Sequence, residues 1–128
     1  MESAADPRFL EGIACFNRRA FFGAHEVWEE IWREEQGPAR RFYQGLIQLA
    51  VCLHHFGNGN TRGAKKLYFT GSDYLQPYRP AYLGIDLDGL LSGMEVCCRA
   101  LLDSADAIPQ GKLDPNLIPT IVSLPARS

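Results

Sequence analysis

The chain has 128 residues and a mass of 14.3 kDa, and 46% of the residues are hydrophobic, which is typical of one domain with one core. Charged residues make up 22% of the chain and leave a formal net charge of -2, without a block of like charges. Because proteins that bind a phosphate backbone usually carry a clear basic excess, nucleic acid is not expected as a partner.

The composition also argues against membrane insertion and secretion. No apolar run approaches the roughly 20 residues that cross a bilayer, and the start, MESAADPRFL, lacks the basic-then-apolar order of a signal peptide. The four cysteines lie in apolar stretches and form no C-x-x-C pair, as is typical of buried thiols in a reducing compartment. We therefore expect a cytoplasmic protein that forms a single domain over residues 1–128.

Capping and stop signals mark the first two helices. Asp6 and Pro7 suit the N-cap and first helical position of a helix that we expect to end near Asn17. A second helix is predicted over residues 21–34, because the glycine and proline in residues 36–38 stop it.

Three further helices are predicted on the same grounds, over residues 38–56, 61–78 and 86–102. Asn60 and Asp86 are the expected N-caps of the last two. No segment alternates between apolar and polar residues as a half-buried strand does. The expected fold is therefore all-α, a bundle of about five helices over residues 7–107.

An offset of 40 residues aligns four similar pairs: Phe16 with Phe56, Ala24 with Ala64, Val27 with Leu67, and Trp28 with Tyr68. This spacing lies within the range of helical-hairpin repeats and favours two stacked helical hairpins. With only two copies, chance explains the alignment almost as well.

Residues 108–128 combine prolines with apolar side chains. The four prolines prevent a regular helix, while the six Leu, Ile and Val residues after position 112 are too much apolar surface for a free linker. We expect an extended arm that packs on the bundle or on a second subunit. A symmetric dimer in which this arm covers exposed helix faces is the expected assembly, and packing on its own bundle is the alternative.

The second helix carries the run H-E-x-x-E. Its inward arc is predicted to hold Phe21, Ala24, Trp28, Ile31 and Trp32. His25 and Glu29 are one turn apart at the edge of that arc, so the pair could hold a metal, or Glu29 could orient His25 as a general base. Glu26 is expected further out, near Arg33. A purely structural His25, hydrogen-bonded beneath the tryptophans, explains the same residues.

The third helix is apolar nearly all the way round, except for one polar stripe. Gln44, Gln48 and His55 fall within an arc of about 40° at the helical angular step. The stripe is either a thin solvent-facing strip or a set of buried groups that need partners. If it is buried, the most economical partners are His25 and Glu29.

Two motifs carry a family resemblance: A-H-E-V-W-E-E-I-W at 24–32 and F-Y-Q-G-L-I-Q-L-A-V at 42–51. Their order and spacing resemble the family known as domain of unknown function 309, over residues 9–75. The resemblance implies an all-helical bundle and brings no particular reaction, substrate or cofactor. The family's characteristic positions fall here on His25, Glu26, Trp28, Glu29, Tyr43, Gln44, Gln48, His54 and His55.

The leading functional hypothesis is a small binding or assembly module with a pocket for a small polar ligand between the second and third helices. Its candidate ligand-binding residues are His25, Glu26, Trp28, Glu29, Tyr43, Gln44, Gln48 and His55. The alternative is a metal-assisted hydrolase in which His25, Glu29 and His55 hold the metal and Glu26 acts as base. A cluster that only fixes helix packing remains a third reading.

Overall fold

The computed structural model describes residues 6–125, which fold mainly into helices. The α-helices are α1 (Pro7–Asn17), α2 (Phe21–Glu34), α3 (Arg40–Gly57), α4 (Thr61–Leu75), α5 (Leu87–Cys97) and α6 (Arg99–Asp103). Two short 3-10 turns, η2 (Gln76–Tyr78) and η3 (Pro115–Leu117), and two short strands, β1 (Ala81–Tyr82) and β2 (Ile85–Asp86), complete the described elements. The predicted all-α bundle is confirmed.

The helices begin where short side chains satisfy free backbone N–H groups. Three predicted N-caps are confirmed by their bonds: Asp6 accepts from the Arg8 N–H (2.9 Å), Asn60 from the Gly63 N–H (3.0 Å) and Asp86 from the Gly89 N–H (3.0 Å). Each bond satisfies one of the donors that the first turn of a helix leaves without a partner. Both ends of α1 and α2 lie at the predicted residues.

The start of α3 differs from the prediction. The helix begins at Arg40, not at Pro38, because the Arg40 N–H bonds back to the Gly37 carbonyl in a turn (3.2 Å). The Arg40 guanidinium then donates to the carbonyls of Trp32 (2.6 Å) and Glu35 (3.0 Å). These bonds join the start of α3 to the end of α2.

The later helices are shorter than predicted. α4 ends at Leu75 and continues as the η2 turn up to Tyr78. The predicted helix over 86–102 is divided into α5 and α6 at Cys98. No glycine or proline marks that break, and the Leu102 N–H still bonds to the Cys98 carbonyl (3.0 Å).

A two-stranded hairpin was not predicted. β1 pairs with β2 in antiparallel register, Ala81 with Asp86 and Tyr82 with Ile85. The two residues between the strands, Leu83 (φ 48°) and Gly84 (φ 79°), both lie at positive φ, as a tight hairpin turn requires. Strands of two residues are too short to show an alternating pattern.

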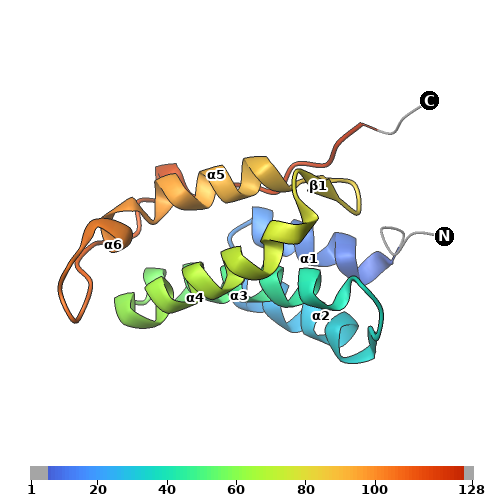
Figure 1. Ribbon diagram of the computed structural model, residues 1–128, viewed down its shortest axis with the longest axis horizontal. Helices are drawn as coiled ribbons and strands as arrows, with labels where there is room; N and C mark the ends of the chain where they lie inside the picture. The colour runs from blue at the N-terminus through green and yellow to red at the C-terminus, as the bar shows by residue number, and fades with distance from the viewer. Residues whose placement is uncertain (1–5, 126–128) are drawn as a thin grey trace.

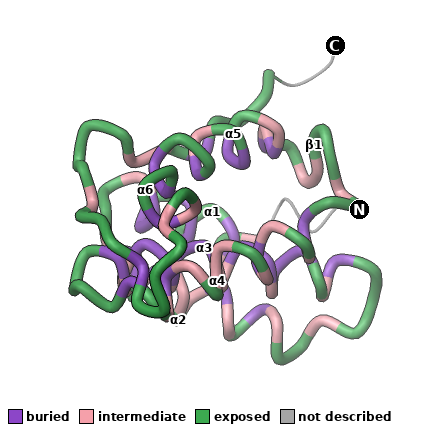
Figure 2. The backbone as a smooth tube through the Cα atoms, turned by 60° about the vertical axis from the view of Figure 1, so that its left-hand side comes forward, coloured by how far each residue is buried: buried purple, intermediate pink, exposed green. Residues whose placement is uncertain are grey.

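Consecutive helices pack against one another along the chain, α1 on α2, α2 on α3 and α3 on α4, while α5 runs along one side of them with α6 at its end (Figure 1). The α1–α2 and α3–α4 pairs therefore meet through α2 and α3, as two stacked hairpins would. The buried positions lie on the helix sides that face the middle of the molecule (Figure 2). No helix within residues 6–125 combines the length and apolar character needed to cross a membrane.

The cysteines belong to the core. All four are buried, and the Cys52 and Cys98 sulfurs are 4.0 Å apart, between α3 and the break that separates α5 from α6. The contact with Cys52 and burial raise the pKa of the Cys98 thiol. The Cys98 thiol is therefore kept protonated, as expected of a packing residue rather than of a nucleophile.

The C-terminal arm folds back onto its own chain. The Asn17 side chain accepts from the Ile121 N–H (2.7 Å) and donates to the Ile121 carbonyl (3.0 Å), and the Ile121 side chain is buried. Ser123 forms an isolated bridge with Ile85 at the edge of the hairpin. Leu117, Val122 and Leu124 stay exposed. Residues 126–128 of the predicted arm lie outside the described residues.

Candidate functional site

A small pocket opens between α2 and α3, with a volume of about 130 Å³. Its lining residues are Glu29, Trp32, Gln44, Ile47 and Gln48, and we call it the α2–α3 pocket. Glu29, Gln44 and Gln48 come from the predicted set, while Trp32 and Ile47 do not. The three polar residues meet here because the helical repeat places each of them on the side of its helix that adjoins the other helix.

The α2 side of the pocket carries a paired carboxylate. Glu29 lies 3.1 Å from the Arg33 guanidinium through Oε1 and 3.8 Å from His25 Nε2 through Oε2. Arg33 was expected near Glu26. Arg33 forms its ion pair with Glu29, one helical turn away, and Glu26 is exposed, as expected for a residue that points outward. His25 therefore borders the pocket through Glu29, and Glu26 is not part of it.

The α3 side of the pocket carries two half-buried amides, Gln44 and Gln48. Gln48 does not bond to His25 or Glu29, as it was expected to do if buried. Its carbonyl oxygen accepts instead from the Thr70 hydroxyl of α4, because α4 packs closely on the other side of α3. The amide nitrogen of Gln48 is left as a donor beside Gln44.

Trp32 is the aromatic wall of the pocket. The Arg40 guanidinium lies over its ring at 4.1 Å from the ring centre, a cation–π contact that fixes the indole. The indole N–H is buried, and no described residue accepts a hydrogen bond from it. An orphaned buried donor costs about 1–3 kcal/mol. Trp32 therefore lines the pocket and also carries a buried indole N–H without an acceptor among the described residues.

Two aromatic members of the predicted set belong to the core instead. Trp28 is fully buried, and its indole N–H donates to the Phe9 carbonyl of α1 (3.2 Å). Tyr43 is fully buried beside Phe9 and Phe42, and burial raises the pKa of its hydroxyl. Both face the α1 side of the bundle, so neither lines the α2–α3 pocket.

His55 also lies apart from the pocket. It shares the polar stripe of α3, but seven residues separate it from Gln48, which is about 10 Å along a helix axis. The imidazole that approaches α2 is His54, whose ring centre lies 5.3 Å from Phe22, and Phe22 in turn lies 5.1 Å from His25.

The three residues proposed as metal ligands, His25, Glu29 and His55, are not assembled as such. Within the described part of the chain, no three His, Cys, Asp or Glu side chains form a group that could hold a metal ion. The hydrolase hypothesis therefore has no support from the geometry.

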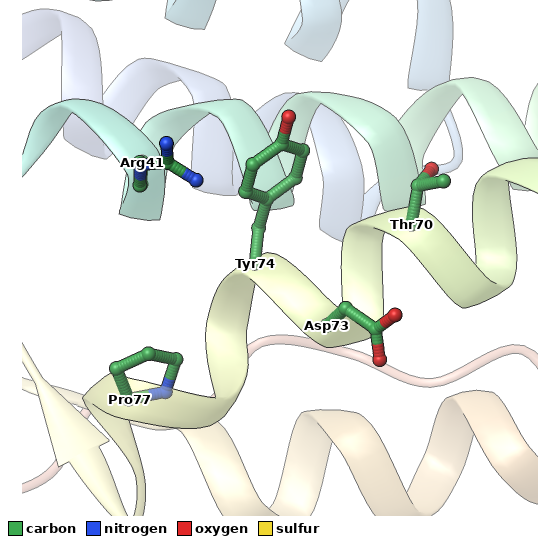
Figure 3. A pocket seen from close by; sticks show the side chains of 5 residues that line it. All are labelled: Arg41, Thr70, Asp73, Tyr74 and Pro77. Atoms are coloured by element: carbon green, nitrogen blue, oxygen red, sulfur yellow. The ribbon is translucent and has the colours of Figure 1, made fainter.

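A second pocket, with a volume of about 310 Å³, is lined by Arg41 of α3 and by residues of α4 and the η2 turn. Figure 3 shows Tyr74 and Thr70 extending from α4 toward α3, Arg41 beside the Tyr74 ring, and Asp73 turned away. The Arg41 guanidinium lies 5.5 Å from the centre of that ring. Thr70 lines this pocket and donates to Gln48 of the α2–α3 pocket, so this hydrogen bond links the linings of the two pockets.

The polar groups that line the α2–α3 pocket are hydrogen-bond donors and acceptors. Gln44 and Gln48 both donate and accept hydrogen bonds, Glu29 accepts, and the Trp32 N–H donates. The Arg33 guanidinium offsets the charge of Glu29. A small neutral group with one donor edge and one acceptor edge would satisfy all of these groups.

Comparison with known proteins gives a family without a described activity. The model of the family described as Domain of unknown function (DUF309) matches residues 9–67, which confirms the resemblance over that stretch and contains the whole α2–α3 pocket.

Two curated relatives match part of the chain. The chain is 41% identical over 80 residues to "Uncharacterized protein YpuF" of Bacillus subtilis (strain 168), which is 60% of this chain and 46% of that protein. It is 38% identical over 53 residues to an "Uncharacterized protein" of Aquifex aeolicus (strain VF5), covering 39% of this chain and 15% of that protein. The chain therefore spans less than half the length of either relative.

Proposed function

We propose that this chain is a small binding module whose α2–α3 pocket takes a neutral polar ligand. The observation that carries the proposal is that Trp32, whose buried indole N–H has no acceptor among the described residues, lines a pocket together with Glu29, Gln44 and Gln48. Buried donors in native proteins are nearly always paired, so an accepting atom in this pocket would complete the site.

A primary carboxamide matches the lining best. Its carbonyl oxygen accepts from donors such as the Trp32 N–H and the Gln48 amide, and its NH₂ donates to the Gln44 carbonyl or the Glu29 carboxylate. A carboxylate of the same shape would lose its two donors and face Glu29, so it is expected to bind much more weakly. A pocket of about 130 Å³ limits the ligand to a group the size of one small ring.

The two tryptophans allow a direct test by NMR, because each gives one indole N–H signal. Titration with nicotinamide is expected to move the Trp32 signal and leave the Trp28 signal in place, since the Trp28 N–H is bonded to the Phe9 carbonyl. Nicotinate, which has the same shape and carries a charge, is the matched ligand control. We expect nicotinate to bind at least about tenfold more weakly, or 1.4 kcal/mol.

A pair of variants separates the pocket from general surface binding. Gln44→Met removes the amide and keeps the length of the side chain, and it should abolish the Trp32 shift. Gln36→Met makes the same change at an exposed position before α3, and it should leave the shift intact. The proposal fails if nicotinamide at millimolar concentration leaves the Trp32 signal unmoved, or if the two variants respond alike.

We also propose that the chain forms a symmetric dimer through exposed apolar residues of the arm. Val122 and Leu124 flank the bridge at Ser123 and are 53% and 42% exposed, although the neighbouring Ile121 is buried. Apolar side chains exposed side by side on an ordered segment favour burial against a second copy.

Light scattering tests the dimer. The full chain is expected to scatter as a dimer at micromolar concentration, and a Val122→Ser/Leu124→Ser variant as a monomer. Point substitutions are preferable to removal of the arm, which would also remove the buried Ile121. Thr120→Ser, at an exposed position of the same arm, is the matched control. A monomeric full-length chain would refute this proposal without affecting the ligand pocket.

A further inference from the structure

A separate pocket of about 300 Å³ lies at the opposite end of α3, where the α1–α2 turn, the end of α3 and the C-terminal arm come together. Its polar lining residues are Arg19, His54 and Asn58, and its apolar walls include Leu53, Leu113 and Ile118. We call it the arm pocket. It shares no lining residue with the α2–α3 pocket.

Arg19 occupies a backbone position that favours glycine. Its φ is 71°, and the chain closes α1 around it through the bonds from the Arg19 N–H to the Phe16 carbonyl (3.0 Å) and from the Ala20 N–H to the Cys15 carbonyl (2.8 Å). This is the left-handed position that ends many helices, where glycine carries no steric penalty and a side chain does. The arginine therefore opposes local stability, and its side chain needs another explanation.

The contacts of the Arg19 guanidinium do not supply that explanation. It donates to the Pro115 carbonyl at 3.4 Å on the exposed surface, which is a weak bond. No carboxylate among residues 6–125 forms an ion pair with it. The nearby Asp114 carboxylate accepts from the Asn116 N–H at the start of η3. Within residues 6–125, the positive charge of Arg19 at this pocket is thus not balanced by an ion pair.

The rest of the pocket matches an anion that carries an apolar chain. The Asn58 amide and His54 Nε2 lie 3.2 Å apart, which places two further polar groups at the same wall. None of the described residues that line the pocket is acidic. Leu113 and Ile118 are half-buried and form an apolar surface beside the cation, with the fully buried Leu53 behind them.

We propose that the arm pocket binds a small aliphatic carboxylate, with the carboxylate paired to Arg19 and the aliphatic chain lying on Leu113 and Ile118. Arginine pairs with a carboxylate through two parallel N–H bonds, which fixes the orientation of the ligand. Burial of the chain against the apolar walls then adds affinity in proportion to its length. This site is additional to the α2–α3 pocket and does not depend on it.

Calorimetric titration of the full chain with octanoate tests the site, together with the variant Arg19→Gly. Because glycine suits the backbone at this position, the variant should melt at the same temperature as the parent chain or higher, while its affinity for octanoate falls at least about tenfold. Arg18→Ala removes a neighbouring exposed charge and should leave the affinity unchanged. Octanol, which lacks the charge, should bind the parent chain at least about tenfold more weakly than octanoate.

The proposal would be overturned if octanoate did not bind the parent chain or if Arg19→Gly bound it with equal affinity. It would also be overturned if Arg18→Ala and Arg19→Gly lost affinity equally. The last would mean that octanoate responds only to the general positive charge of the α1–α2 turn. A variant Arg19→Gly that melts well below the parent chain would show that the arginine is structural, and this too would contradict the proposal.

Discussion

Replacing Trp28 with alanine is expected to lower the free energy of unfolding by about 3–5 kcal/mol, as is typical when a large aromatic side chain is removed from a packed core. The Trp28 side chain is fully buried, and it packs against Phe16 with ring centres 6.2 Å apart. Its loss also leaves the Phe9 carbonyl without the indole donor. Because small domains have only about 5–15 kcal/mol of stability, the variant should be close to unfolded.

Urea melts of Trp28→Ala and Phe22→Ala provide the comparison. Phe22 lies on the same helix and is 50% exposed, so its removal should cost about 1 kcal/mol or less. Similar losses in the two variants would contradict the orientation of α2 described here, in which Trp28 is buried and Phe22 is exposed.

Adding one methyl group at Gly45 is expected to lower the free energy of unfolding by about 1–3 kcal/mol, the usual cost of overpacking a core. A Cβ atom there would lie 2.6 Å from Leu75 Cγ and 3.1 Å from the Gly71 carbonyl oxygen. Leu75 is fully buried and Gly71 contributes backbone, so α3 and α4 would have to move apart. The close approach of these two helices is therefore what requires glycine at position 45.

Gly23→Ala is the matched control, because it makes the same change in α2. A Cβ atom at Gly23 would meet Cys15 Sγ at 3.7 Å, an ordinary contact. Alanine is the better helix former by about 0.5–1 kcal/mol, so this variant should gain stability by that amount. Equal changes at the two glycines in thermal melts would exclude the tight α3–α4 contact.

The sequence predicted those parts of the fold that depend on neighbouring residues. The caps at Asp6, Asn60 and Asp86 each join a side chain to a backbone N–H two or three residues away, so the helix starts could be read locally. The break at Cys98 could not, because no local signal marks it and Cys98 is buried against Cys52 of α3. The β1–β2 hairpin was missed because its strands have two residues each.

For the candidate site too, the sequence predicted the features that depend on helical spacing and missed those that depend on how the helices pack. Helical spacing placed Glu29, Gln44 and Gln48 on facing sides of α2 and α3, and these three do line one pocket. The same spacing put Trp28 and Trp32 on one arc, yet only Trp28 is fully buried, because α1 covers it and Trp32 lies beside α3. Which neighbouring helix covers each side chain is a property of helix packing, which periodicity does not contain.

The partner of Gln48 illustrates this point. The bond from the Thr70 hydroxyl depends on the relative position of α3 and α4, and Thr70 is 22 residues away in the sequence. No motif around Thr70 indicates a functional role. The sequence could have indicated Trp32 as a lining residue of the pocket, because Trp32 lies three residues after Glu29, about one turn further along the same side of α2.

The central claim is that the α2–α3 pocket holds a ligand carbonyl against the Trp32 indole. A crystal structure of the chain soaked with nicotinamide, at a concentration that saturates the Trp32 NMR signal, tests it most directly. We expect electron density for the nicotinamide amide between Trp32 and Gln44, with the amide oxygen within hydrogen-bond distance of the indole nitrogen. Density for nicotinamide elsewhere on the chain, with the α2–α3 pocket unchanged, would contradict it.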